Sequence, residues 1–533
     1  MQVTGMPGSS IDDVLAELRN VVGVAQVLVD ADERTFYAQD VYNQVEPPIA
    51  VIRPGSVDEL ARAMRIASGA GIAIVPRGGG MSYTDGYLPS HPHSITVDMQ
   101  RLDRVIEVSA EDRYVTVECG ATWRSLHDAL APHRLRTPYW GPLSGIKATI
   151  GGALSQGSMF LGSGLYGPVQ ESLLGLEVLL ADGSLVKVGA SANAHGPPFF
   201  RHYGPDLSGV FTGDCGAMGI KVRATFRLIR PQPEARFLSF ECTDHTSLFA
   251  AIADVAREGI VSECFAFDPG LQAVRMKRSS LAADVKALGN VVKSSGGVLS
   301  GLKEGARVMM AGRSFLSQGT YSLHISLDGR DPADADAKAA IVRRLVGGRG
   351  REVENTIPKV MRSNPFMEVN SMLGPGGERW VPVHGTVPFS RAAGTYEACE
   401  GVYARHADAI ARFDIDKGYL IASVGSTGIL IEPVFYWPDA RLAFHERVLD
   451  SAYLAKLERF PDNPPARAAV DQMRRELADT LTHAGAASFQ LGKFYPYQEG
   501  LDPSAARLLK AVKTAVDPEG LMNPGTLGLG LPQ

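Results

Sequence analysis

The sequence predicts an α+β protein, and two observations carry this prediction. From residue 51 to residue 77, two apolar strand-like segments flank an amphipathic helical segment, which is a βαβ pattern. After about residue 236, helical segments alternate with strand segments in a way that suggests an antiparallel sheet covered by helices. We therefore expect two folded parts, followed by a C-terminal segment too short to fold alone.

The βαβ unit follows from its residue types in order. The segment AVIRP is an apolar strand, and Ser56 opens the helical segment SVDELARAMRIASGAG. Leu60, Met64 and Ala67 recur at helical spacing and should face the sheet. The second strand is IAIVPR, and a glycine-rich loop follows it directly.

Further strands extend this first part to about Pro233. They are predicted at SITVDM, at YVTVEC, in the hairpin LLGLEVLLADGSLVKVG with its turn at Asp182–Gly183, and at IKVRATFRLIRP. Residues 148–170 carry no charge, but their Gly, Ser, Gln and Pro content favours a buried glycine-rich loop region over a membrane span.

The second part carries the alternation of helices and strands. Helices are predicted at SLFAAIADVAREGI, ADAKAAIVRRLV and ARLAFHERVLDSAYLAKLERF, and strands at TYSLHISLDG, RWVPVHGTVPF and TGILIEPVFYW. A last helix, SAARLLKAVKTAVD, should pack back on another domain. The expected division is 1–235, 236–480 and 481–533.

Composition excludes several classes of function. The 533 residues include 53 basic and 58 acidic side chains, a net charge of −5, so binding to nucleic acid through its phosphates is not expected. Five scattered cysteines without a CxxC pair encode neither a disulfide framework nor a thiolate zinc site. We expect a cytoplasmic protein, because the N-terminus shows no secretory signal and the cysteines favour a reducing compartment.

The glycine-rich loop Arg77-Gly78-Gly79-Gly80-Met81-Ser82-Tyr83 indicates an anion site. Three consecutive glycines can take positive φ, which we expect at Gly79 among them, and can turn their N–H groups toward one point. The loop is neither a Walker loop nor the GxGxxG of a Rossmann unit. A different phosphate-bearing ligand is therefore predicted, and a plain tight loop is the alternative.

Two later motifs follow in order, TIGGALSQG and GDCGAMGI, and DPEGLMNPG stands near the end of the chain. Together with PRGGGMSY and GLEVLLADG, these strings resemble the successive signatures of the vanillyl-alcohol oxidase / p-cresol methylhydroxylase class of FAD flavoproteins. The resemblance implies a PCMH-type FAD-binding domain of two α+β subdomains, with FAD between them, and a cap domain whose sheet covers the flavin ring.

The resemblance also implies which residues contact FAD. Residues 77–83 would hold the pyrophosphate, loops near 142–157 would run beside the ribityl chain and flavin, Ile220 would contact the adenosine half, and Asn523 would lie close to the flavin. The implied cofactor-binding residues are Pro76, Arg77, Gly78, Gly79, Gly80, Met81, Ser82, Tyr83, Pro142, Leu143, Ser144, Thr149, Gly151, Gly152, Ser155, Gly157, Ile220 and Asn523.

The chain departs from its relatives at three positions. Met81 stands where many members carry a flavin-linking histidine, so we expect non-covalent FAD, with His384 as the alternative attachment point. Phe489-Gln490 stands where phenol-oxidising members carry Tyr-Arg, which puts a phenol substrate in doubt. The stretch 423–430 lacks the histidines of metal-dependent hydroxy-acid dehydrogenases, so no metal is expected.

The predicted reaction is hydride transfer from an alcohol CH–OH to the flavin, with a secondary alcohol, a benzylic alcohol or a 2-hydroxy acid as substrate. The alternatives are oxidation of a para-substituted phenol, non-redox chemistry like that of alkyl-glycerone-phosphate synthase, and a silent FAD-binding protein. The electron acceptor, dioxygen or another, is left open, and so is a homodimer.

Five side chains are candidates for catalysis. His384, Glu432, Tyr436 and Tyr495 are candidate bases, and Lys493 is a candidate cation beside the reduced flavin. A structural role in a strand, in the core or at the surface is the alternative for each. Arg362 and Arg379 are candidates for binding a substrate carboxylate, with exposed ion pairs as the preferred interpretation.

Overall fold

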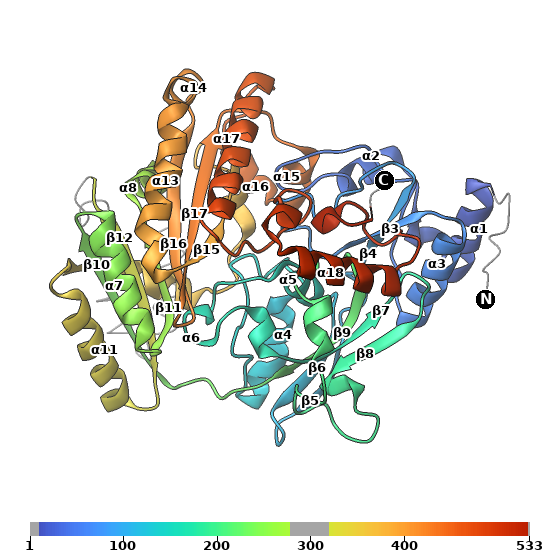
Figure 1. Cartoon of the computed structure of the whole chain (residues 1–533), viewed down its shortest axis with the longest axis horizontal. Coiled ribbons are helices and arrows are strands. Elements are labelled where there is room, and N and C mark those ends of the chain that lie inside the picture. Colours follow the sequence, from blue (N-terminus) through green and yellow to red (C-terminus); the bar gives the residue numbers. More distant parts are fainter. Residues whose placement is uncertain (1–9, 278–318, 531–533) are drawn as a thin grey trace.

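The computed structural model describes residues 10–277 and 319–530, and it contains three sheets (Figure 1). The first has the strand order β1-β2-β4-β3, with β2, β4 and β3 parallel and β1 antiparallel. Its strands are β1 (Val27–Leu28), β2 (Ala50–Ile52), β3 (Ala73–Arg77) and β4 (Ser94–Asp98), and its helices are α1 (Ile11–Val22), α2 (Ala31–Tyr37) and α3 (Val57–Gly69).

The predicted βαβ unit is confirmed by β2, α3 and β3. The Ser56 hydroxyl accepts a hydrogen bond from the Glu59 N–H at 3.1 Å and caps α3. Leu60, Met64 and Ala67 are buried, as helical spacing predicts for the face that packs on the sheet. This unit places the glycine-rich loop at the carboxyl end of β3, where a parallel sheet commonly binds its ligand.

The second sheet is antiparallel, with the order β5-β6-β9-β7-β8. Its strands are β5 (Val105–Ser109), β6 (Tyr114–Glu118), β7 (Leu173–Leu179), β8 (Leu185–Gly189) and β9 (Ile220–Arg227), and the helices within this segment are α4 (Trp123–Leu130), α5 (Ile150–Gln156) and α6 (Ser163–Tyr166). The predicted hairpin turn is present, with Gly183 at φ +73°. The loop prediction for 148–170 is wrong in part, because Thr149 caps α5 and α6 follows it.

The third sheet is antiparallel and belongs to the second part of the chain. Its order is β13-β10-β12-β11-β16-β17-β14, and β15 also pairs with β17. The strands are β10 (Glu234–Cys242), β11 (Val261–Phe267), β12 (Tyr321–Gly329), β13 (Gly350–Val353), β14 (Arg379–Pro382), β15 (Gly385–Pro388), β16 (Asp416–Val424) and β17 (Gly428–Trp437). The second sheet ends with Arg227 and the third begins with Glu234, so the expected boundary at 235 falls just inside β10 and stays a proposal.

Helices cover one face of this third sheet (Figure 1). They are α7 (His245–Arg257), α11 (Pro332–Val346), α13 (Ala392–Arg405), α14 (Ala407–Arg412) and α17 (Pro464–His483). Ile429, Ile431 and Phe435 of β17 point into the core beneath these helices, whereas Leu430 and Val434 face the opposite side. That opposite side, which also carries Glu432, is called the cap face below, and α8 (Pro269–Lys277) and α12 (Thr356–Ser363) pack beside it.

The helix predicted over residues 440–460 is wrong in its length. Two short helices, α15 (Ala443–Val448) and α16 (Ser451–Leu454), replace it because Asp450 caps the second of them. After α17 and α18 (Pro503–Val516), the chain returns to the first sheet. There the Asn523 N–H donates to the Ile74 carbonyl at 2.8 Å, so the C-terminal segment extends the edge at β3.

Candidate functional site

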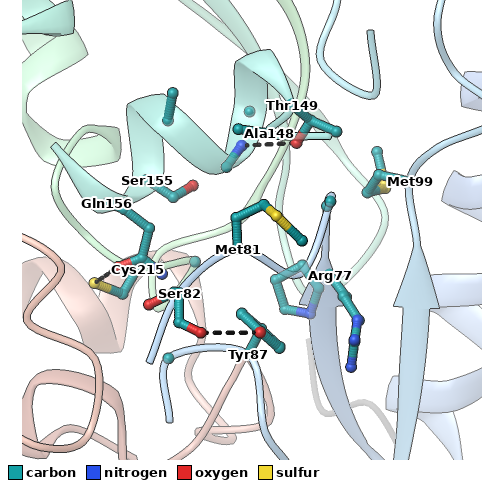
Figure 2. A pocket seen from close by; sticks show the side chains of 18 of the residues that line it. Arg77, Met81, Ser82, Tyr87, Met99, Ala148, Thr149, Ser155, Gln156 and Cys215 are labelled. Carbon is teal, nitrogen blue, oxygen red and sulfur yellow. Dashed lines mark hydrogen bonds between the residues drawn. The ribbon is translucent and has the colours of Figure 1, made fainter. Parts of the chain in front are cut away.

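A cavity of about 900 Å³, part of which is open to solvent, lies where three loop segments meet (Figure 2). The first segment follows β3, the second includes the start of α5, and the third precedes β9. These are the segments PRGGGMS, TIGGALSQ and CGAMGI, which lie far apart in the sequence. The strand order brings all three together at one end of the first two sheets.

The loop after β3 presents unpaired backbone donors. Among the described residues, no acceptor is hydrogen-bonded to the N–H groups of residues 78–82, although the carbonyls of Gly80 and Ser82 accept from the Tyr87 hydroxyl. In contrast, the Gly151 N–H at the start of α5 already donates to the Cys119 carbonyl at 2.8 Å. The loop therefore is the part of the cavity wall best suited to a phosphate.

Each glycine of this loop is required for a different reason. A Cβ on Gly78 would lie 2.2 Å from the Thr149 hydroxyl, and one on Gly79 would lie 1.9 Å from the Lys147 carbonyl oxygen. Gly80 has φ +70°, whereas the positive φ expected at Gly79 is wrong. At Gly79 the constraint is the close approach of the backbone segment at residue 147, which sequence alone does not show.

The Arg77 side chain lies behind the loop. Its Nη1 donates to the carbonyls of Tyr37 and Gln39, both at 3.0 Å, and its guanidinium lies 4.8 Å from the Tyr87 ring centre. Lys221 is a second buried cation in the cavity wall. Its ammonium group forms an ion pair with Asp214 at 2.6 Å. The cavity thus has buried cations near its wall, which suits an anionic ligand.

Most of the residues expected to hold FAD line this cavity. They are Pro76, Arg77, Gly78, Gly79, Gly80, Met81, Ser82, Pro142, Ser144, Thr149, Gly151, Gly152, Ser155 and Ile220. The free N–H groups, the glycine cradle and the cavity volume fit a dinucleotide such as FAD. Figure 2 shows the Met81 side chain pointing into this space, between the first loop and α5.

Four of the expected residues lie elsewhere. The Tyr83 hydroxyl accepts from Gln490, and its ring packs against Trp380 and His384 on the cap side. Leu143 packs against the cap face, and Gly157 ends α5 at φ +67°. Asn523 is fully buried, and its amide donates to the carbonyls of Gly86 at 2.7 Å and Cys215 at 2.8 Å, so it supports two residues of the cavity wall.

Sequence reasoning missed other residues of the wall. Gln156, Cys215, Gly216 and Gly219 lie within motifs that were recognised, so the motifs themselves were the signal. Other wall residues carry no local signal, because only tertiary packing brings them to the cavity. These others are Gly86, Tyr87, Met99, Cys119, Ala148, Ser158 and Lys221, whereas Ala153 lies within TIGGALSQG and Gln490 was named only as a departure from phenol-oxidising members.

None of the five predicted catalytic residues lines this first cavity; His384 and Glu432 are close to each other on the cap face. The pairs Pro382↔Val434 and Gly385↔Ile431 flank His384, so the same register continued between them sets His384 opposite Glu432. Opposed residues on one face have Cβ atoms about 5 Å apart. The Tyr83 ring contacts the His384 ring, and burial and the negative charge of Glu432 raise the pKa of Tyr83.

His384 is fully buried and has one free nitrogen. Its ring stacks on Phe489 with centres 3.8 Å apart, and its Nδ1 lies 3.2 Å from the Tyr495 hydroxyl. That hydroxyl accepts from the His384 backbone N–H at 2.8 Å, so its own hydrogen is available to Nδ1. Burial lowers the pKa of His384 to about 3, and Nε2 has no hydrogen-bond partner among the described residues.

Glu432 is a weak acid in this environment. Burial raises the pKa of Glu432 to about 8, and the nearby positive charge of Arg275 opposes that increase. The neighbours of Glu432 on the cap face are apolar or aromatic, including Val434, Leu430 and Leu420.

The remaining two candidates occupy different places. Tyr436 is buried on the cap face opposite Trp380, four residues beyond Glu432 on β17. The Lys493 ammonium is held by the Leu88 carbonyl and by the Asn523 side chain at 3.0 Å. Burial lowers the pKa of Lys493 to about 8, and this cation lies behind the wall rather than in it.

The expectation of exposed ion pairs at two arginines is wrong. Arg362 is largely buried and bonded to Glu263 and Asp328. Arg379 is fully buried, donates to the carbonyls of Tyr42 and Ala440, and stacks on Trp437. Both guanidinium groups are engaged by protein acceptors, which leaves neither oriented toward a substrate carboxylate.

The described residues form neither a metal-ligand cluster nor a membrane-spanning helix. Within 10–277 and 319–530, no three His, Cys, Asp or Glu side chains gather as metal ligands would. Over the same ranges, no helix has the length and apolar character needed to cross a membrane.

Known proteins match this geometry. Residues 48–189 match the FAD binding domain family. The curated relatives include D-lactate dehydrogenase [cytochrome] 1, mitochondrial, of Saccharomyces cerevisiae, which is 27% identical over 42% of this chain and 38% of its own length. Glycolate oxidase subunit GlcD of Bacillus subtilis is 29% identical over 42% and 46%, respectively. The aligned region thus spans less than half of each of these two relatives.

Solved structures match over the whole chain. p-Cresol methylhydroxylase with substrate bound has a TM-score of 0.72 at 19% identity and covers 97% of this chain and 96% of its own. Alkyldihydroxyacetonephosphate synthase has a TM-score of 0.69 at 14% identity, with 98% and 87% covered. The chain therefore has an FAD-binding domain and the α+β fold of p-cresol methylhydroxylase.

Proposed function

We propose that this PCMH-type FAD-binding protein oxidises an alcohol CH–OH to a carbonyl on the cap face, beside His384 and Glu432. The observation that carries the proposal is the pairing of these two residues on the cap face. Relatives named for D-lactate and glycolate oxidise CH–OH groups, which supports the reaction class. When bound, FAD supplies the acceptor for the hydride that leaves the substrate carbon.

In this proposal, Glu432 removes the hydroxyl proton. A carboxylate with a pKa near 8 is a much better base than an ordinary glutamate, and it is ionised in mildly alkaline solution. Imidazole is the weaker candidate, since burial lowers the pKa of His384 to about 3. With Nδ1 accepting from Tyr495, the neutral ring keeps its proton on Nε2 and donates a hydrogen bond from it to the substrate oxygen, while Glu432 takes the hydroxyl proton.

The surroundings favour an uncharged alcohol over a phenol or a hydroxy acid. Phe489 stacks on His384, and Gln490 donates to the Tyr83 hydroxyl. Neither Phe489 nor Gln490 supplies a cation to a phenolate. Arg362 and Arg379 are bonded to other protein groups. A secondary or benzylic alcohol is therefore the proposed substrate, and a 2-hydroxy acid is the variant to be tested beside it.

Anaerobic mixing tests this proposal. The holoprotein is mixed without oxygen with secondary alcohols, benzylic alcohols, 2-hydroxy acids and para-alkylphenols, and the flavin absorbance is followed. Bleaching by the alcohols supports the proposal, and admission of air then separates an oxidase from a dehydrogenase. Bleaching by phenols alone would overturn it, and so would bleaching by no substrate, which is the behaviour of a non-redox or silent flavoprotein.

A further inference from the structure

We infer that a small apolar hollow next to the cap face holds a short, uncharged alkyl group of the alcohol substrate. This inference rests on the proposed function and narrows its substrate class. The hollow lies between α6 and the strands β11, β16 and β17, and it is separate from the FAD cavity described above. Its wall is almost entirely apolar.

Residue size creates this hollow. Phe265, Ala422 and Leu430 are cross-strand neighbours on three adjacent strands, and the small Ala422 stands between two large side chains. Across from them, Gly164 lets α6 approach β11 closely, because a Cβ there would lie 2.9 Å from the carbonyl oxygens of Val261 and Ser262. Space thus remains above Ala422, bounded by the Phe160 ring.

The hollow lies beside the proposed reaction site on the cap face. Leu430 lines it, and Leu430 lies two residues before Glu432 on the same face of β17. Residues two apart on a strand are separated by about 7 Å, which is the length of a short alkyl chain. On the FAD side, Ser158 lines the FAD cavity and the next residue, Met159, lines the hollow.

Charge argues against a carboxylate in this space. Glu263 contributes a carboxyl group to the wall, and that group accepts from the Gly162 N–H at 3.0 Å and from Arg362 at 3.0 Å. Arg362 is shared between Glu263 and Asp328, so its charge is already balanced by two carboxylates. An alkyl group gains binding free energy in the hollow, because the transfer of each methylene from water to an apolar site is favourable.

The test uses tertiary alcohols, which bind like substrates but have no hydrogen on the carbinol carbon. Their dissociation constants are measured on the holoprotein from the change in flavin absorbance, for chains from 2-methylpropan-2-ol to 2-methylhexan-2-ol. We expect each added methylene to tighten binding about fourfold until the hollow is full. Ala422→Leu should abolish this dependence on chain length, and Leu430→Ala should extend it to longer chains.

The controls separate this inference from the proposed function. Ala505→Leu makes the same change on the exposed surface of α18 and should leave the dependence intact. Thermal unfolding shows whether each variant is folded. If Ala422→Leu is not folded, Leu430→Ala alone tests the hollow. Equal binding of all chain lengths to the wild type, or unchanged dependence in both hollow variants, would overturn the inference. Chain-length dependence without bleaching by any secondary alcohol, benzylic alcohol or 2-hydroxy acid would instead overturn the proposed function.

Discussion

Replacing Gly79 by alanine should release FAD, because the added methyl group has no room. Its Cβ would lie 1.9 Å from the Lys147 carbonyl oxygen, so that carbonyl must retreat by about 1.1 Å before the contact reaches even 3.0 Å. The displaced segment leads directly into Ala148 and Thr149, which form the opposite wall of the cavity. Overpacking of this kind costs about 1–3 kcal/mol, which weakens FAD binding by about 5- to 150-fold.

The assay compares flavin content per protein and the FAD affinity of the apoprotein for wild type, Gly79→Ala and Gly79→Val. Gly209→Ala is the matched control, because a Cβ there meets nothing within 4 Å and its φ is not positive. The larger valine should have the larger effect. Gly79→Ala protein that is folded and binds FAD with wild-type affinity would refute the reasoning that this loop holds the cofactor.

Four further predictions concern Glu432, the flavin linkage and metal ions. The rate of flavin reduction by alcohol should rise with pH through about 8, as Glu432 ionises. Glu432→Gln should lower this rate by about 10²- to 10⁴-fold and remove its rise with pH. An unchanged rise in the variant would exclude Glu432 as the base. Because the folded-state pKa of Glu432 lies above its ordinary value of 4.5, folded protein loses stability as pH rises from 4.5 through 8, and Glu432→Gln should remove that loss in denaturant titrations. After acid precipitation the yellow colour should stay in the supernatant; colour in the washed pellet that disappears in His384→Ala would instead identify a covalent link. Dialysis against EDTA should leave activity unchanged, and recovery of a lost activity with zinc or manganese would show that a metal site was overlooked.

The FAD loop could be predicted from sequence because its chemistry lies in consecutive residues. An apolar strand followed by three glycines and a serine encodes a turn with free N–H groups, whatever surrounds it. The helix α3 was predictable for a similar reason, since its cap and its buried face are written within thirteen residues. Such features depend on local backbone geometry and on helical spacing.

The candidate reaction site could be predicted only in part. His384 and Glu432 were each recognised as candidate bases, but 47 intervening residues separate them in the chain, and their opposition follows from the register of β14 and β15 on β17. Their pKa values depend on burial beneath other parts of the chain, which residue type does not reveal. The same holds for Arg379, whose expected exposure gave way to complete burial against Trp437.

By itself, the sequence determined the α+β class, the strand and helix order near the glycine-rich loop, and the three glycines that are proposed to bind a phosphate. The tertiary structure decided why Gly79 is a glycine, which candidate bases share a surface, and where an apolar group of a substrate has space beside Ala422. The physical reason is the distance along the chain between the residues that each feature depends on. Hydrogen-bonding turns and helical faces are fixed by neighbours in the chain, whereas steric exclusion, desolvation and cavities depend on residues that only folding brings together.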